Sequence, residues 1–515
     1  MRTYLIGLDY GSESARGVLI DAESGHQVAH HVHPYRHGIM TTVLPEGSSI
    51  PSGFTLQNAN DYTEAAANIL SRLGRGRTIH GIGLGFTASS PLPASADGVP
   101  LSRQYPGDPH AYVKLWKHNA QAYADSINCR PAPFLDNFGG RVSGEWLLAK
   151  AAQIAAEAPA LWAATDRYIE SGDWLVWQLT GQEARGLGFA AFKAQFSAEA
   201  GYPEGIVEGL HERLSAPLPV GSAAGTLSAE WRDVTGIQGA AVVAVAVIDS
   251  HVLLPAIGAV SPRCFVGALG TSAAYLYLGD AYRPLPPGIE GVAFDGSMRQ
   301  LWCYEAGQPS FGDTLAWFVR TFPRGKDMQA SFLAYNEEVA ALAPAAGRLV
   351  AIDWLGGNRV PFADGNLTGL LAGLTRHTTA GEIYLALMEG LCFGARTIFD
   401  LFPSGGLPVD RVLMASGLAR ANPLLIQMMA DVLDCRVEVP DIENATAVGA
   451  AIHGAVASGA VETYAEGAAR FGAQRFTHIE PQPANASRYR SVYEIYRGLT
   501  SGGTVHSAMH ALRDL

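Results

Sequence analysis

The chain opens with apolar runs that alternate with short polar turns. "TYLIGLD", "ARGVLID" and "HQVAHHV" are joined by "YGSES" and "AESG". Short β-branched and aliphatic runs bounded by Gly, Ser and Asp predict strands, so consecutive hairpins are expected here. Further along, apolar runs alternate with longer patterns of helical spacing. That alternation predicts an α/β protein.

A second copy of the opening pattern appears after residue 260. "RCFVGALGTSAAYLYLGD" repeats the plan of "RTYLIGLDYGSESARGVLID": an apolar strand, a turn of small residues, and another apolar strand. Gly7 corresponds to Gly267, and the turn at Gly11-Ser12 corresponds to the turn at Gly270-Thr271-Ser272. Two such units, half a chain apart, predict a duplicated domain.

The chain between the two copies contains a turn-rich stretch, "VGSAAGTLSAEWRDVTG". We place the domain boundary after it, near Asp249, which predicts domains at 1–250 and 251–515. A length of 515 residues fits two domains, since single cores rarely grow beyond about 300 residues.

The C-terminal half contains a legible helix and a strand–turn–helix unit. "TAGEIYLALMEGLCFGARTIF" begins with the capping-box pair Thr379 and Glu382 and continues with apolar residues at helical spacing. "RVLMAS" then predicts a strand, "GLARA" a turn, and "NPLLIQMMADVLD" a helix. Asn422 is a suitable N-cap for that helix, and Pro423 suits its first position.

Composition and charge exclude several classes of function. The formal charge is 36 − 48 = −12, which argues against a nucleic-acid partner. The five cysteines are far apart and form no CxxC, so neither a zinc site nor a redox pair is indicated, and a reduced cytosolic compartment fits. No uncharged apolar run reaches the ~18 residues of a membrane span. The first apolar run is broken by Asp9, so no signal peptide or membrane anchor is expected.

Asp9 ends a predicted strand and precedes a glycine turn. A carboxylate there can hold a hydrated Mg²⁺ beside phosphates, because Mg²⁺ keeps most of its water and binds few protein groups. A simple turn aspartate is the alternative. The duplicated turn favours the first interpretation, since two Gly/Ser/Thr turns facing each other could donate N–H groups to a polyphosphate.

Asp249 directly follows "AVVAVAVI", which predicts a buried strand. An acidic group at the carboxyl end of a strand and at a domain junction is well placed to react, here as a general base for a hydroxyl. The alternative is a helix N-cap.

Three further positions have two interpretations each. Glu305 in "YEAGQPSFGDTLAWF" could accept hydrogen bonds from sugar hydroxyls or be a buried structural carboxylate. Lys193 in "FAAFKAQF" could bind a polar ligand or extend to the surface. "ASGLARANPLL" could receive a nucleotide at a capped helix, or simply connect a strand to a helix.

Other familiar motifs are absent or poor. The sequence has no GxxxxGK[ST] and no GxSxG, and "GIGLGF" is followed by "TASSPLP", which cannot open a dinucleotide-binding helix. The histidines on the third strand and after it have no metal-ligand partners in the sequence, so a surface edge is expected there: His30, His31, His33 and His37.

Eight strings together resemble the FGGY carbohydrate kinases, and most closely the ribulokinase-like members. The strings occur in the family's order between residues 4 and 456: "GLDYGSESARG", "YVKLWKHNAQ", "SGEWLLAK", "ESGDWLVWQLTG", "VIDSHV", "LGTSA", "EAGQPSFGD" and "ASGLARANPLL…ATAVGAAI". "YVKLWKH", "ESGDWLVWQLTG" and "EAGQPSFGD" are long and unusual, whereas the tail from Val461 onward is uninformative.

The resemblance implies an α/β fold of two actin-like (ribonuclease H-like) ATPase domains with a catalytic cleft between them. It implies a cytoplasmic enzyme, expected as a homodimer, that transfers the ATP γ-phosphate to the terminal C5 hydroxyl of a ketopentose. The most similar members use L-ribulose. ATP, Mg²⁺ and a small sugar are then the expected ligands.

The resemblance also assigns site residues by position. Asp249 matches the general base, and Asp9 matches the aspartate that helps hold Mg²⁺, chiefly through water. The sugar pocket would be lined by Ala88, Lys193, Asp249 and Glu305. The ATP-binding set would be Gly11, Ser12, Arg16, Gly270, Thr271, Ser272, Gly312, Ser416, Gly417 and Asn422, with an exposed structural role as the alternative for Arg16.

Two positions depart from the family pattern. Related kinases often carry an aspartate where this chain has Gly85, which leaves D-ribulokinase and xylulokinase activities as alternatives. Ser416 replaces the first glycine of the adenosine turn, and nucleotide binding is expected to survive if position 416 avoids a positive φ. A regulator that binds sugar and ATP without phosphate transfer, and an actin-like structural ATPase, are rival functions. The presence of both Asp9 and Asp249 speaks against the regulator.

Overall fold

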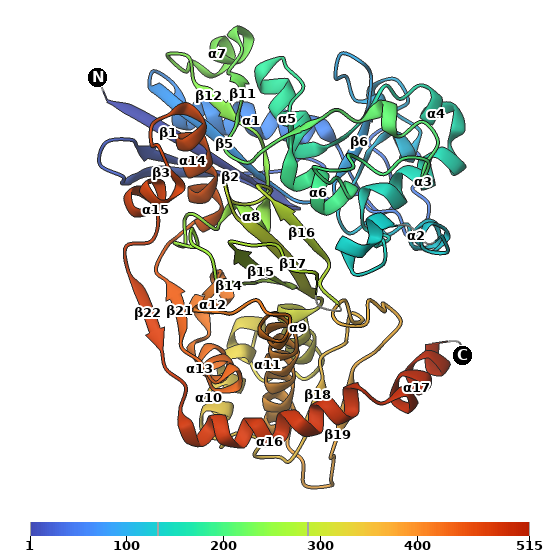
Figure 1. Ribbon diagram of the computed structural model, residues 1–515, viewed down its shortest axis with the longest axis vertical. Helices are drawn as coiled ribbons and strands as arrows, with labels where there is room; N and C mark the ends of the chain where they lie inside the picture. The colour runs from blue at the N-terminus through green and yellow to red at the C-terminus, as the bar shows by residue number, and fades with distance from the viewer. Residues whose placement is uncertain (1, 131–132, 286–287, 514–515) are drawn as a thin grey trace. The chain divides into compact units, whose positions relative to one another are not determined.

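The computed structural model describes residues 2–130, 133–285 and 288–513 and forms two compact units (Figure 1). The first unit contains residues 1–260, 292–303 and 442–474, and the second contains residues 261–291, 304–441 and 475–515. Both units are therefore discontinuous in sequence, whereas the sequence analysis predicted a single boundary near residue 250.

The first unit contains the following strands: β1 (Thr3–Tyr10), β2 (Ser14–Asp21), β3 (Gln27–Pro34), β4 (Leu56–Gln57), β5 (Thr78–Phe86), β6 (Pro91–Ala94), β7 (Val113–Lys114), β8 (Arg167–Glu170), β9 (Arg185–Gly186), β10 (Pro217–Leu218), β11 (Ala223–Thr226), β12 (Val242–Ala244) and β13 (Val247–Ile248). Its α-helices are α1 (Ala59–Gly74), α2 (Gln121–Asn128), α3 (Leu147–Glu157), α4 (Pro159–Ala163), α5 (Ser171–Thr180), α6 (Leu187–Ala194), α7 (Ala229–Thr235), α8 (Asp249–Val252), α14 (Ala445–Ser458) and α15 (Tyr464–Phe471). Short 3-10 helices occupy Leu101–Arg103, Pro109–Ala111, Pro133–Phe138 and His211–Arg213.

The second unit contains β14 (Cys264–Leu269), β15 (Ala273–Gly279), β18 (Val350–Ile352), β19 (Leu370–Ala372), β20 (Arg411–Ala415), β21 (Val437–Pro440) and β22 (Phe476–Ile479). The chain passes between the units within β16 (Gly291–Phe294) and β17 (Trp302–Gln308). The helices of this unit are α9 (Phe311–Thr321), α10 (Met328–Ala340), α11 (Ala380–Ser404), α12 (Gly417–Ala421), α13 (Pro423–Leu433), α16 (Pro483–Thr500) and α17 (Gly503–Arg513).

The first unit is built on a sheet of order β11-β12-β5-β1-β2-β3, in which β13 also pairs with β5. Strands β12, β5 and β1 are parallel, whereas β1, β2 and β3 form the predicted antiparallel hairpins. Helix α14 packs on one face against β1 and β5, and α1 packs against β2 and β3. The position of Gly17 opposite Ile69 and Leu73 of α1 puts that helix on the other face.

Glycines allow α14 to approach the sheet closely. A Cβ at Gly7 would lie 1.8 Å from the carbonyl oxygen of Ala447, and one at Gly83 would lie 1.8 Å from that of Ala450. No side chain fits at such distances, so the glycines of "GIGLG" serve helix–sheet packing, which agrees with rejecting them as a dinucleotide fingerprint.

The second unit repeats the same plan in the sheet β16-β17-β15-β14-β20-β21-β22. Strand β14 pairs antiparallel with β15 and parallel with β20, as β1 pairs antiparallel with β2 and parallel with β5. The duplicated strand–turn–strand unit that the sequence predicted is therefore confirmed. In each copy the first strand also pairs in parallel with a strand from later in the chain.

Local predictions from the domain boundary onward are confirmed, with two corrections. Helix α11 starts with the Thr379–Glu382 capping box, and Asn422 caps α13 with Pro423 at its first position. "GLARA" was predicted as a turn and is the short helix α12. "AVVAVAVI" was predicted as one strand and is split into β12 and β13, both paired with β5.

The C-terminal tail from Val461 onward, uninformative in sequence, begins with α15 in the first unit and continues as β22, α16 and α17 in the second. Helix α16 packs along α13, β18 and α11 at the base of the second unit (Figure 1). The hydroxyl of Tyr496 on α16 donates to Asp353 Oδ1 at 2.7 Å, and both side chains are buried. The part of the tail that contains α16 is thus an integral part of the second core.

Candidate active site

The carboxyl ends of three adjacent strands carry the predicted polar residues of the first unit. In the sheet register Asp9 of β1 lies beside Gly85 of β5, and Gly85 lies beside Val247 of β13. Ala88 follows β5, and Asp249 follows β13. Because these strands are parallel, Asp9, Ala88 and Asp249 meet at one edge of the sheet, where α/β folds place ligands.

The first predicted phosphate loop, at Gly11-Ser12, is held by hydrogen bonds from neighbouring residues. Gly11 N donates to Ser14 O at 3.0 Å and closes the turn. Gln57 Nε2 donates to Ser12 O at 2.6 Å, and Trp116 Nε1 donates to Ser12 Oγ at 2.9 Å. Gly11 and Ser12 remain partly exposed, so the loop is braced while its surface stays open to a ligand.

Asp9 is a partly exposed residue whose carboxylate lies in poorly solvated surroundings. Its Oδ2 accepts a hydrogen bond from Thr446 Oγ1 at 2.6 Å, and Arg16 lies directly across from it in the hairpin. Burial raises the pKa of Asp9, while the Thr446 bond and the Arg16 charge oppose the rise. A divalent cation would offset this desolvation.

The donor set around Asp9 fits a cation held mainly through water. Among the described residues, no group of three or more His, Cys, Asp or Glu could hold a metal ion. A single carboxylate beside a phosphate loop suits Mg²⁺, which keeps several waters and takes further ligands from substrate phosphates.

Asp249 is the first residue of α8 rather than its N-cap, which is Ile248. Its Oδ1 accepts the N–H of Ser250 at 2.7 Å, and the residue is half-buried. Two residues after Asp249, His251 is buried, with Nδ1 2.6 Å from Ser297 Oγ. The backbone carrying Asp249 is therefore anchored, and the residue is partly exposed.

A buried polar network surrounds the segment that contains Ala88. Glu170, at the end of β8, accepts from Ser89 Oγ and from Ser90 N, each at 2.7 Å. Lys150 Nζ, on α3, donates to Ser89 O at 2.8 Å and to Leu115 O at 2.9 Å. The sequence analysis did not single out Lys150 or Glu170, although both lie in the quoted strings "SGEWLLAK" and "ESGDWLVWQLTG".

The electrostatics of this network include Lys193. Burial lowers the pKa of Lys150 to about 7, and the charge of Glu170 opposes that change. Burial raises the pKa of Glu170. The Lys193 charge acts on both groups, so this lysine of α6 lies near them, and it is buried rather than extended to the surface.

The second unit holds the other predicted loop. Gly270 N donates to Ser272 O at 2.8 Å, which repeats the closure of the first loop. Gly312 N and Asp313 N, at the start of α9, donate to Gly270 O at 3.0 Å and to Thr271 O at 3.2 Å. A Cβ at Gly312 would lie 2.6 Å from Gly270 O, so a glycine is needed for this brace.

The predicted adenosine turn lies between β20 and α13. Ser416 has φ 138 and ψ 176, a region that favours glycine, so the sequence-based condition of a non-positive φ is not met. Its hydroxyl donates to Leu269 O and accepts from Ala419 N. Gly417 is exposed with open space beside it, and the Asn422 side chain is used as the cap of α13.

Glu305 lies in the middle of β17 in the second unit and is only 9% exposed. Its carbonyl oxygen accepts from Glu290 N at 2.9 Å. The structure thus places Ala88, Lys193 and Asp249 in one unit and Glu305 in the other.

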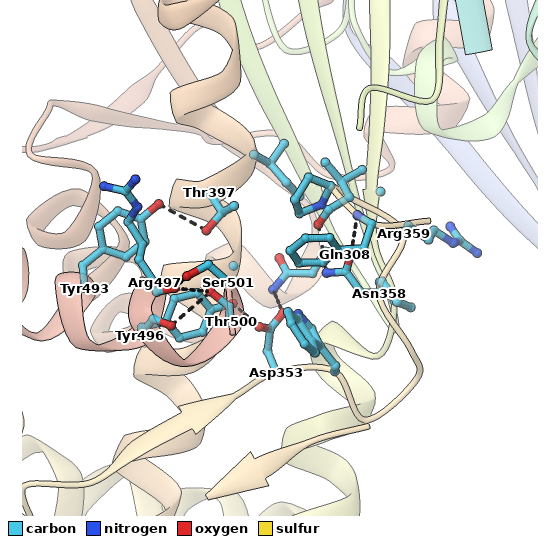
Figure 2. Close-up of a pocket in the computed structure, with 18 residues that line it drawn as sticks. Gln308, Asp353, Asn358, Arg359, Thr397, Tyr493, Tyr496, Arg497, Thr500 and Ser501 are labelled. Carbon is cyan, nitrogen blue, oxygen red and sulfur yellow. Dashed lines mark hydrogen bonds between the residues drawn. The ribbon is translucent and has the colours of Figure 1, made fainter. Parts of the chain in front are cut away.

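A cavity of about 160 Å³ in the second unit lies apart from these residues. Figure 2 shows Gln308, Asp353, Tyr496 and Thr397 around it, from β17, the segment after β18, α16 and α11. Gln308 Nε2 donates to Asp353 Oδ2 at 2.7 Å, and Tyr275 OH donates to Gln308 Oε1 at 2.9 Å. These polar groups already satisfy one another, so the cavity gives no sign of a ligand.

The family assignment rests on similarity along nearly the whole chain. A ribulokinase from Geobacillus thermodenitrificans is 36% identical and covers 97% of this chain and 94% of its own length. A ribulokinase from Mycolicibacterium smegmatis is also 36% identical, over 96% of this chain and 92% of its own. Residues 266–458 match the family model "FGGY family of carbohydrate kinases, C-terminal domain". The chain belongs to the FGGY carbohydrate kinases.

Solved structures of this fold agree. A crystal structure of a "xyloylose kinase" from Brucella ovis gives a TM-score of 0.84 at 21% identity and covers 99% of this chain and all of that one. Plasmodium falciparum glycerol kinase with ADP gives a TM-score of 0.80 at 12% identity, over 96% and 98%. The predicted fold of two actin-like domains is confirmed.

This FGGY kinase is therefore a ribulokinase-like carbohydrate kinase that uses ATP and a sugar as substrates. No helix among the described residues is long and apolar enough to cross a membrane. The roles assigned to Asp9, Asp249 and the two loops stay predictions. The sequence-based predictions did not include Lys150, Glu170 or Thr446. Each is a polar residue within an apolar or small-residue run, and that position was the signal that could have identified it.

Proposed function

We propose that this kinase phosphorylates L-ribulose at its C5 hydroxyl. The observation that carries the proposal is the position of Asp249, partly exposed on an anchored backbone, at the same sheet edge as Asp9 and Ala88. The name that the similar proteins share, ribulokinase, supports the choice of a ribulose.

In this proposal the protein contributes positioning and charge rather than covalent chemistry. Asp249 orients the sugar hydroxyl and accepts its proton as the O–P bond forms. Alignment of that hydroxyl would supply roughly 7–11 kcal/mol of the barrier reduction. The N–H groups of Ser12 in the first loop, and of Thr271 and Ser272 in the second, would bind phosphate oxygens. The Gly11 and Gly270 N–H groups close their own turns.

Mg²⁺ is proposed as the companion of ATP, with Asp9 holding it through water. When bound, it would neutralise phosphate charge. Thr446 then has a clear role: its hydroxyl occupies Asp9 Oδ2 and fixes the orientation of the carboxylate. Arg16, across the hairpin from Asp9, tempers the local negative charge.

D-Ribulose and a xylulose are the alternative substrates, because Gly85 offers no carboxylate where related kinases have one. In this chain the space beside Gly85 is filled by Val252. The sugar at this edge would therefore be recognised by Ala88, Lys193 and Asp249. The sugar-binding role of Glu305 rests on the family resemblance alone.

The test is ADP release in parallel with L-ribulose, D-ribulose, L-xylulose, D-xylulose and glycerol, with ATP and Mg²⁺ present. We expect L-ribulose to give the highest kcat/KM, with both ribuloses ahead of both xyluloses. Preference for glycerol or an aldose would overturn the proposal. Sugar binding by calorimetry without ADP release would instead identify a non-catalytic regulator.

We also propose a cytoplasmic homodimer acting in arabinose breakdown, as the ribulokinase resemblance implies. Light scattering of the purified chain tests the assembly, since a dimer has twice the monomer mass. A monomeric mass at working concentrations would contradict it.

A further inference from the structure

The segment Thr87–Ser90 follows β5 and contains Ala88, the residue of 81–90 that is not fully buried. Its two ends are attached to the rest of the sheet edge. Thr87 N donates to Tyr10 O at 3.1 Å, next to Asp9, and Ser90 O accepts from Ser171 N at 3.1 Å and Ser171 Oγ at 2.5 Å. The middle of the segment, Ser89, is bonded to side chains of other elements.

Ser89 is held instead by two charged side chains from elements distant in sequence. Glu170 Oε1 accepts from Ser89 Oγ and its Oε2 accepts from Ser90 N, both at 2.7 Å. Lys150 Nζ donates to Ser89 O at 2.8 Å. Lys150 is 0% exposed and Glu170 is 2% exposed. Burying two charges costs several kcal/mol per ion, so a fold that needed only packing would be served better by apolar residues here.

Lys150 also ties this segment to the "YVKLWKH" segment, through Leu115 O at 2.9 Å and Lys114 O at 3.4 Å. Three acceptors match the three N–H donors of an ammonium group, and the two oxygens of Glu170 match two donors. The polar atoms of Lys150 and Glu170 are therefore occupied by the Thr87–Ser90 and "YVKLWKH" segments rather than directed at a substrate.

We propose that Lys150 and Glu170 are positioning residues for sugar recognition: they set the backbone of Thr87–Ser90, and so hold Ala88 in the geometry that the sugar requires. Neither residue touches the reacting atoms. The proposal rests on the proposed function only in that Ala88 and Lys193 face the sugar, whichever sugar the enzyme uses.

The test compares the KM for sugar with the KM for ATP in four variants: Glu170→Gln, Lys150→Met, Ser89→Ala and Gln153→Met. Glutamine has one acceptor oxygen, so it leaves one of the donors at Ser89 and Ser90 without a partner. Loss of one buried hydrogen bond of this kind corresponds to a roughly tenfold change in the sugar KM. We expect Glu170→Gln and Lys150→Met to raise the sugar KM about tenfold or more, with the ATP KM within about twofold of the parent.

Gln153→Met is the matched control, because Gln153 lies on the same helix as Lys150, is similarly buried, and bonds to His118 rather than to the Ala88 segment. It should lower stability without separating the two KM values. Ser89→Ala removes a single hydroxyl and is the variant expected to fold normally. Its effect on sugar KM should be smaller in the Glu170→Gln background than in the parent, since both changes act on one hydrogen-bond network.

Equal changes in the sugar and ATP KM values, additive effects of Ser89→Ala and Glu170→Gln, or unchanged kinetics in folded variants would each overturn the positioning role. The measurements use the best sugar of the parent enzyme. A parent that prefers a sugar other than L-ribulose therefore contradicts the proposed function and leaves this test intact.

Discussion

Gly85 and Val252 are in direct contact: a Cβ at position 85 would lie 2.7 Å from Val252 Cγ1. Val252 is the last residue of the short helix that begins with Asp249. The sheet therefore supports the helix of the proposed base through a position where only glycine fits, and a change at 85 is transmitted to Asp249.

Gly85→Ala should lower kcat by about tenfold and destabilise the protein by about 1–3 kcal/mol, because the added methyl must displace Val252 and with it α8. Steady-state kinetics and urea unfolding measure the two effects. Val252→Ala in the same chain makes room and should restore part of the turnover. Gly365→Ala, where the structure has open space and an ordinary φ, is the control. A fully active Gly85→Ala enzyme would contradict this coupling.

Asp249→Asn should cut kcat by ~100-fold or more while leaving ATP affinity nearly unchanged, because asparagine keeps the shape but cannot accept the hydroxyl proton. ADP release and nucleotide titration measure the two quantities. Near-normal turnover would remove Asp249 from the role of base. Asp233→Asn, at an exposed residue of α7 in the same unit, provides the carboxylate control.

Asp9→Asn should raise the melting temperature without ligands and lower activity at limiting Mg²⁺ by about tenfold or more. Burial raises the pKa of Asp9, so at neutral pH the ionised form is less favourable in the fold than in the unfolded chain, and its removal stabilises. Asp21→Asn is the opposite control, since hydrogen bonds from the turn lower the pKa of Asp21 and its loss should destabilise. An unchanged Mg²⁺ dependence would argue against a role for Asp9.

Ser416→Gly should stabilise the protein by about 1 kcal/mol, because glycine adopts φ 138 without strain and loses little as an N-cap. Ser416→Ala keeps the strain and loses the hydroxyl cap, so it should destabilise by about 1 kcal/mol. Urea unfolding of the pair measures the difference, and ADP titration should show binding in both. Both variants lack the hydroxyl that donates to Leu269 O, so equal stabilities would mean that glycine relieves no backbone strain at position 416.

Stability should rise with pH between about 7 and 10 through Lys114. Its ammonium lies 4.3 Å from the Phe54 ring centroid and has no hydrogen-bond partner among the described residues. Burial lowers the pKa of Lys114 to about 7. Between that pKa and the unfolded one, near 10.5, the unfolded chain binds the extra proton, and raising the pH removes this advantage by up to about 1.4 kcal/mol per pH unit.

Urea unfolding of Lys114→Met at pH 7, 8 and 9 checks the Lys114 prediction. We expect a shallower pH dependence than in the parent and a higher stability at pH 7. Lys117→Met, at an exposed lysine three residues away, should leave the pH dependence unchanged. Parallel curves for the parent and Lys114→Met would show that this lysine stays charged throughout.

The local elements were predictable from sequence because their signals are local. The hairpins at Asp9 and Gly270, the Thr379 capping box and the Asn422 cap depend on residues within a few positions of one another. The duplicated pattern needed only a comparison of two stretches of the same chain. "GLARA" was misread because five residues without periodicity do not distinguish a turn from a single helical turn.

Tertiary structure alone decided what surrounds those elements. Helix α14, more than 400 residues after β1, packs on Gly7 and Gly83, and no local pattern indicates that partner. The same holds for Lys150 and Glu170, which reach Ser89 from two elements 61 and 81 residues away. The sequence by itself determined the repeated strand–turn–strand units and the candidate carboxylates. Long-range packing decided that Lys150 and Glu170 hold the Ser89 segment, because a hydrogen bond depends on distance in space and not on spacing along the chain.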